Sequence, residues 1–164
     1  LVIKDKEIPV KGDGYHDHYW GTKDLYDIFR GWYWGRLNDP KYTIIFSYTQ
    51  LLDGNWAPSL YIADDKATLL ATDQYDFVVE KEEADLKTGE KYAGIISLKY
   101  DAYDLKLNCR LDTKGIVEHG PLPRVNEFNM SNWRFLADYE GQITIDGKTE
   151  KIKGETIHER LIFR

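Results

Sequence analysis

The stretch Tyr42-Thr43-Ile44-Ile45-Phe46-Ser47-Tyr48-Thr49-Gln50 alternates large apolar and small polar side chains along most of its length. Successive side chains of a β-strand point to opposite faces, so residues two apart share a face. The apolar face holds Tyr42, Ile44, Phe46 and Tyr48, and the polar face holds Thr43, Ser47 and Thr49. This pattern predicts a strand with one buried face and one wetter face.

The rest of the chain repeats this pattern of short strands and turns. Further strands are predicted at 1–10, 59–63, 68–72, 75–80, 91–100, 103–111, 133–145 and 149–163. The turn signals are Asp53-Gly54-Asn55, Asp112-Thr113-Lys114-Gly115 and Asp146-Gly147, of which the last is typical of a type I′ hairpin. Residues 81–90 and 120–131 are predicted to be loops, and 23–29 and 81–87 are the best helical stretches. About eight to ten antiparallel strands predict an all-β, lipocalin-like barrel, because closure removes exposed edges.

Length and composition favour one domain over residues 1–164, with a sizeable core. The net charge of -6 argues against nucleic acid as the main partner, because the basic residues do not form a cluster. No apolar run is long enough to cross a bilayer as a helix. Cys109 is the single cysteine, so an internal disulfide is excluded, which fits a reducing compartment without establishing one. The chain shows no signal peptide, and its compartment stays open.

Bulky aromatic residues and histidines gather near the start of the chain. The first segment is Gly12-Asp13-Gly14-Tyr15-His16-Asp17-His18-Tyr19-Trp20-Gly21, and the second is Arg30-Gly31-Trp32-Tyr33-Trp34-Gly35-Arg36-Leu37. If the first segment is extended, His16, His18 and Trp20 share one face; in the second, Trp32, Trp34 and Arg36 do so. Each buried aromatic removes roughly 150–250 Å² from water, so such a concentration indicates a core or a ligand cavity.

These two segments resemble the hydroxyneurosporene synthase (carotenoid 1,2-hydratase) and AttH-like family. The resemblance rests on Gly-Tyr-His-Asp-His-x-Trp-Gly at 14–21 and Trp-x-Trp-Gly-Arg at 32–36, with looser support from 134–141 and 154–159. Members have two consecutive lipocalin-like β-barrel domains, and the first motif lies near the junction of the two. The resemblance therefore implies that this chain is one AttH-like barrel, corresponding to the C-terminal half of a longer two-barrel protein.

For the hydratases the resemblance implies addition of water to an isoprenoid double bond without a redox cofactor. Such an alkene must be protonated in a dry pocket, where aromatic faces stabilise the cation. His18 and Trp20 match motif positions that the family places in its pocket. The family's Tyr-x-Asp can be matched to Tyr48-Thr49-Gln50, where an amide replaces the acid, or to Phe46 and Tyr48, again without an acid.

The candidate site residues follow from the resemblance and the alternation together. The predicted catalytic residues are His18, Asp17, Tyr48 and Glu159, and the predicted ligand-binding residues are His16, Trp20, Trp32, Trp34 and Arg36. Asp17 and Glu159 are the candidate acids, although each is also explained by pairing with neighbouring side chains. No metal site is assigned. The alternative is that His16 and His18 bind a metal with a third ligand from His119, His158 or Glu159.

The favoured interpretation is a lipocalin-like domain that binds an apolar small molecule, an isoprenoid or other lipid, in an aromatic-lined cavity without a cofactor. Two alternatives stay open. One is a lyase that adds water to, or cyclises, a terpenoid by acid catalysis, and the other is a metal-binding or purely structural barrel. The expected partners are the apolar molecule and either a second lipocalin-like domain or a second copy of the chain.

Overall fold

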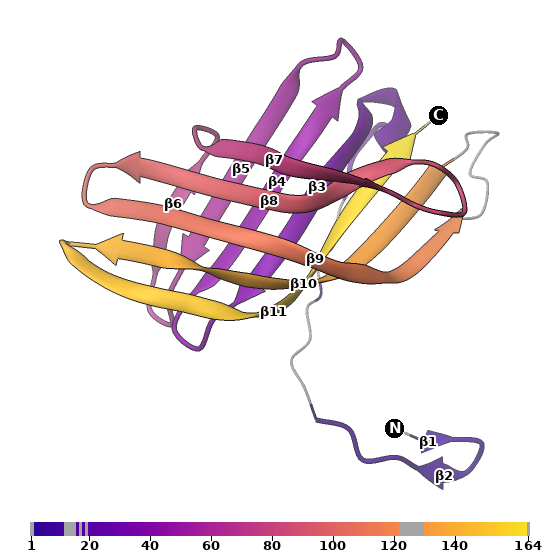
Figure 1. The fold of residues 1–164 in the computed structure, drawn as a ribbon, viewed down its shortest axis with the longest axis horizontal. Coiled ribbons are helices and arrows are strands. Elements are labelled where there is room, and N and C mark those ends of the chain that lie inside the picture. Colours follow the sequence, from indigo (N-terminus) through magenta and orange to yellow (C-terminus); the bar gives the residue numbers. More distant parts are fainter. Residues whose placement is uncertain (1, 12–15, 17, 19, 122–129, 164) are drawn as a thin grey trace.

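Most of the chain folds into β-strands joined by short turns (Figure 1). The structure is a computed structural model that describes residues 2–11, 16, 18, 20–121 and 130–163. The elements are β1 (Val2–Ile3), β2 (Lys6–Glu7), a 3₁₀ turn (Leu25–Asp27), β3 (Phe29–Asn38), β4 (Thr43–Leu51), β5 (Trp56–Ala63), β6 (Thr68–Thr72), β7 (Asp76–Ala84), β8 (Lys91–Ala102), β9 (Leu105–Pro121), β10 (Met130–Ile145) and β11 (Lys148–Phe163). Within the described part, no helix has the length and apolar character to span a membrane.

One antiparallel sheet of nine strands contains almost all of these elements, in the order β6-β5-β4-β3-β11-β10-β9-β8-β7. Except for β6 and β7, strands of this sheet that follow one another along the chain are neighbours, and β3 pairs with β11. The all-β, antiparallel prediction and its strand number are therefore confirmed. The sheet is not closed, because no ladder joins β6 to β7 in the described residues.

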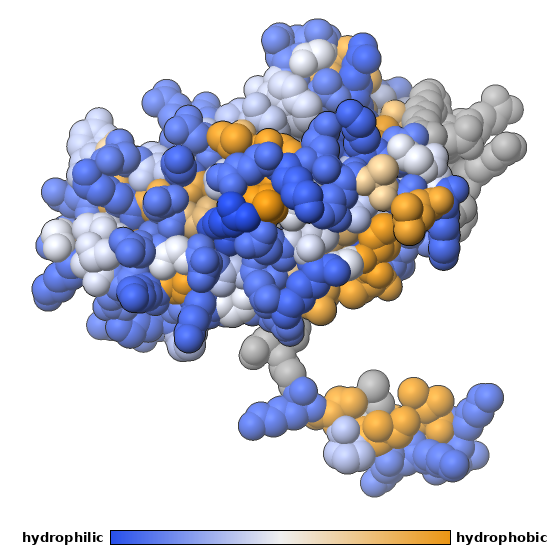
Figure 2. Space-filling view, in the orientation of Figure 1, coloured by the Kyte–Doolittle hydropathy of each residue, from blue (hydrophilic) through white to orange (hydrophobic). Residues whose placement is uncertain are grey.

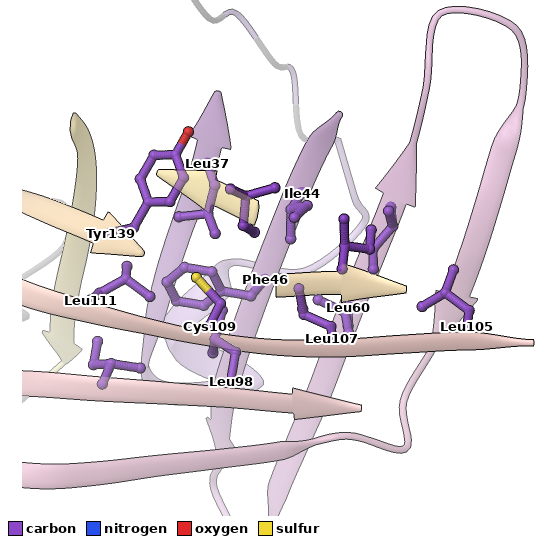
Figure 3. Packing of buried hydrophobic residues seen from close by; sticks show 14 of the residues in the cluster. Leu37, Ile44, Phe46, Leu60, Leu98, Leu105, Leu107, Cys109, Leu111 and Tyr139 are labelled. Carbon is purple, nitrogen blue, oxygen red and sulfur yellow. The ribbon is translucent and has the colours of Figure 1, made fainter. Parts of the chain in front are cut away.

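The two halves of the sheet lie across one another and enclose the core. Figure 1 shows β3, β4 and β5 crossing the direction of β7, β8 and β9. Buried side chains from both halves meet between them (Figure 3), including Phe46 and Leu60 on one side and Leu98, Leu107 and Leu111 on the other. Each contributes roughly 1.5–3 kcal/mol by burial. The interior of the described sheet is therefore a packed core.

Side chains also bridge the two halves where β6 and β7 do not pair. The Phe77 ring of β7 stacks on Tyr48 of β4 with centroids 4.6 Å apart. The Tyr75 hydroxyl, in the link before β7, donates a hydrogen bond of 2.8 Å to the Ser47 carbonyl. The free edge of β7 includes Glu80, Lys81 and Glu82. Charge on an edge strand opposes pairing with other chains.

The structure differs from two of the predicted loop and turn regions, and at the first of them bulges and cross-strand ion pairs explain the difference. The expected turn at 112–115 is part of β9, whose pairing with β10 skips Lys114 and Val117 as bulges. The bulges bend the strand, and Lys114 binds Asp138 and Glu155 across the sheet at 2.8 and 2.9 Å. The expected loop at 81–90 is strand as far as Ala84. The Asp146-Gly147 turn is confirmed, with φ of 50° and 75°.

The N-terminal segment is a small hairpin separate from the main sheet. Lys4 and Asp5 both have positive φ (49° and 62°), so the predicted strand at 1–10 is instead two short strands around a tight turn. Figure 2 shows apolar surface gathered on this hairpin. Val2, Ile3, Ile8 and Val10 are all exposed.

Candidate functional site

An open groove of about 410 Å³ lies where β3 begins and where β4 and β11 end. Its described lining is mostly aromatic and aliphatic, with one amide and one guanidinium: Tyr26, Phe29, Arg30, Gln50, Leu52, Ile162 and Phe163. The 3₁₀ turn supplies Tyr26, and the residue after β4 supplies Leu52. Three separate parts of the chain therefore form this groove.

A glycine allows the strands to meet closely at this end. A Cβ on Gly31 would lie 2.1 Å from the Leu161 carbonyl oxygen, which is far inside van der Waals contact. The pairing of β3 with β4 also shifts register between Phe29 and Gly31. Arg30 is therefore the extra residue of a bulge, and bulges redirect side chains at the ends of sheets.

A chain of edge-to-face rings runs along the groove. The Phe163 ring lies 6.4 Å from Tyr26 and 5.8 Å from Trp32, and Trp32 lies 6.4 Å from Phe29. Each pair is T-shaped, the arrangement that the charge distribution of the rings favours. One wall of the groove is therefore built from aromatic rings that hold one another in place.

Glu159 contacts this wall through Trp32, and its carboxylate already has partners within the protein. Its Oε1 accepts a hydrogen bond of 2.8 Å from Trp32 Nε1, and its Oε2 lies 3.9 Å from Arg134 Nε. The carboxylate therefore orients the indole and faces a cation. Its predicted role as an acid stays a prediction, because the groove lining does not include it.

Trp32, Trp34 and Arg36 share one face of β3, as the alternation predicted, but it is the face opposite the core. Tyr33 and Leu37 pack into the core from the other face. Gly35, between them, is buried against the Phe46 ring. The three predicted ligand-binding residues thus lie on the face away from the core, and the Trp32 ring contacts Phe29 and Phe163 of the groove wall.

Tyr48 points into the interior and is held by other rings. It stacks between Trp56 and Phe77, at 4.5 and 4.6 Å. Gln50, two residues further along the same strand, lines the groove. The structure therefore places Gln50 in the groove and leaves Tyr48 in a packed aromatic stack.

The histidine motif lies apart from these residues. His16, His18 and Trp20 are exposed and belong to no strand, and Trp20 is 87% exposed. The His18 and Trp20 rings are 6.0 Å apart. Asp17 lies outside the described residues. The described parts contain no group of three His, Cys, Asp or Glu side chains suited to a metal.

Polar side chains whose burial was not predicted from the sequence lie inside the sheet. His158 is 0% exposed, and its Nε2 lies 2.9 Å from the Thr113 hydroxyl while its ring stacks on Phe135 at 4.8 Å. Burial lowers the pKa of His158 to about 4, so the imidazole is neutral at pH 7. The Arg160 guanidinium lies 4.5 Å over the Tyr33 ring. Strict alternation from Ile152 through Thr156 would have placed His158 and Arg160 inside.

Asp85 forms a second buried polar group, at the turn between β7 and β8. Its carboxylate accepts hydrogen bonds from the Lys87 backbone N–H at 2.9 Å and from Trp133 Nε1 at 3.1 Å, and His119 Nδ1 lies 3.1 Å away. The bond from Lys87, followed by that from Trp133, lowers the pKa of Asp85. The His119 ring stacks on Trp133 at 4.6 Å. This group ties the turn to β9 and β10.

No protein-family model matches the chain, and no curated protein matches it. The class of protein is therefore set by the structure alone, as an all-β domain built on one folded antiparallel sheet.

Proposed function

We propose that this protein is a lipocalin-like domain that binds an apolar small molecule, an isoprenoid or other lipid, in the aromatic groove at the ends of β3, β4 and β11. The observation that carries the proposal is the groove itself. Its volume of about 410 Å³ falls within the range of roughly 300–1,000 Å³ that is typical of small-molecule sites. Its wall of T-shaped rings offers a rigid apolar surface.

The order of the strands supports the lipocalin-like part of the proposal. From β3 to β11 every consecutive pair except β6 and β7 forms a ladder, and the last strand returns to the first. This is the connectivity of an up-and-down barrel with one ladder missing. The packed interior favours a ligand at the end of the sheet over one inside it.

The lining of the groove favours binding over catalysis. Hydration of an alkene needs a proton donor in the pocket. The described lining contains no carboxylic acid and no imidazole, and Gln50 stands where the resemblance to the hydratases would place the acid. A ligand-binding role asks only for apolar area and shape, both of which the groove offers.

Titration with a neutral apolar fluorophore, N-phenyl-1-naphthylamine, tests the proposal. We expect saturable binding that Phe163→Ala weakens by about tenfold. The variant removes the ring that contacts both Tyr26 and Trp32 in the groove wall. Tyr103→Ala is the matched control, since Tyr103 is 97% exposed, lies in the turn between β8 and β9 and does not line the groove. Equal loss in both variants, or no saturable binding, would contradict the proposal.

Native mass spectrometry of the untreated protein complements this titration. The proposal predicts an added mass of a few hundred daltons that is lost on denaturation. The same spectrum reports whether the chain forms a dimer, in which a second copy would supply the second lipocalin-like domain. A mass equal to one transition metal would instead favour the metal-binding alternative at His16 and His18.

A further inference from the structure

The groove contains one charged side chain. Among the lining residues that the structure describes, Arg30 alone carries a full charge at pH 7. The chain as a whole has 28 acidic residues against 22 basic ones, and several cations of the sheet surface are held by acids at 2.6–2.8 Å. A cation at an apolar groove therefore calls for its own explanation.

Among the described residues, Arg30 is held by a backbone carbonyl and not by an acid. Its Nε and Nη2 both donate to the Leu52 carbonyl oxygen, at 2.9 and 2.8 Å. In the described residues no carboxylate lies within ion-pair distance of it. A guanidinium has five N–H donors, so three remain, and the Nη1–Nη2 edge retains the planar fork that suits a carboxylate.

The acids Asp24, Asp27 and Glu159 are not among the described residues that line the groove. Asp24 accepts a hydrogen bond of 2.5 Å from the Tyr26 hydroxyl, and Glu159 accepts from Trp32 Nε1. Asp27 is exposed, on the 3₁₀ turn, and does not line the groove. Arg30 is thus the charged group that a ligand in the groove meets.

We infer that the groove binds a single-chain lipid with a carboxylate head group, whose oxygens pair with the free edge of Arg30 while its apolar chain lies along Phe29, Ile162 and Phe163. The inference rests on the proposed function and adds the class of ligand. One cation matches the single charge of a carboxylate. A phosphate monoester carries about −1.5 to −2 and calls for a second cation, which the described lining lacks.

The test compares cis-parinaric acid with its methyl ester, because the two share one apolar chain and differ in the charge of the head. We expect the full chain to bind the acid at least about tenfold more tightly than the ester, as a charge-assisted bidentate pair implies. Arg30→Met should abolish that preference by lowering the affinity for the acid to that for the ester. Lys99→Met, which removes an exposed cation of β8, is the matched control and should retain the preference.

The outcomes separate this inference from the proposed function. Equal binding of acid and ester by the unmodified protein overturns the carboxylate inference and leaves the apolar site standing. Absence of saturable binding of either probe overturns both. A preference for the acid that survives in Arg30→Met overturns the assignment to Arg30. Tighter binding of a lysophosphatidic acid than of a fatty acid with the same chain contradicts the choice of carboxylate.

Discussion

Acidification should destabilise the fold through His158, and the size of the effect follows from its burial. The side chain is 0% exposed, and burial lowers its pKa from 6.5 to about 4. The unfolded state therefore takes up a proton more readily, so the stability that is present above about pH 6.5 is lost as the pH falls towards 4. One pKa unit corresponds to about 1.4 kcal/mol, so the complete effect is about 3 kcal/mol, of which roughly 2.5 kcal/mol is lost between pH 7 and pH 4.5.

His158→Gln isolates this contribution from that of every other titrating group. The amide does not titrate in this range and can still bond to the Thr113 hydroxyl, which lies 2.9 Å from Nε2. Urea unfolding of both proteins at pH 7 and pH 4.5, at constant ionic strength, gives four free energies of unfolding. The wild type should lose about 2.5 kcal/mol more than the variant between the two pH values. If both lose the same amount, the imidazole is not buried in its neutral form and the reasoning fails.

Two further predictions concern the core. Gly35→Ala places a methyl group 2.5 Å from the buried Phe46 ring and should lower the free energy of unfolding in urea by roughly 1–3 kcal/mol. Gly115→Ala is the control, with nothing within 4 Å of its new methyl group, and should change that free energy by less than about 0.5 kcal/mol. Similar losses in both variants would contradict the packing at Gly35. Burial raises the pKa of Cys109 to about 12, so a disulfide reagent at pH 8 should label the native protein at least about 100-fold more slowly than the urea-unfolded protein, and prompt labelling of the native thiol would show that β9 is accessible.

The local pattern of the sequence was sufficient to find the strands. Alternation at 42–50 corresponds to β4, and its apolar face, with Ile44 and Phe46, does point into the core. The Asp-Gly pair at 146–147 forms the turn between β10 and β11. These features depend on interactions between residues close together in the chain, which a sequence displays directly.

Features set by distant residues were not accessible in this way. Both faces of β3 carry aromatic side chains, so alternation shows which residues share a face and not which face is inside. The buried face is decided by Gly35, whose lack of a Cβ admits the Phe46 ring. The turn expected at 112–115 is strand, and this too depends on distant residues. Bulges accommodate the extra residues of β9, and Lys114 forms ion pairs with Asp138 and Glu155.

The candidate site was predicted only in fragments for the same reason. Arg30 and Phe163 are more than a hundred residues apart, and neither belongs to a recognisable motif. Their meeting depends on the pairing of β3 with β11 and on the close approach at Gly31. The resemblance drew attention to Gln50 because an amide stands there in place of an acid. The other residues of the groove come together only in the folded sheet.

Because β3 pairs with β11, the last strand, this ladder cannot form until nearly the whole chain has been synthesised. β3 ends at Asn38 and β11 ends at Phe163, so about 125 residues must leave the ribosome before β3 gains its second neighbour. At 5–20 residues per second this takes roughly 6–25 s, during which one side of β3 has unpaired backbone groups and exposed indole rings. The nascent chain is therefore most vulnerable to aggregation in that interval, and a chaperone that recognises extended aromatic segments would protect it at β3.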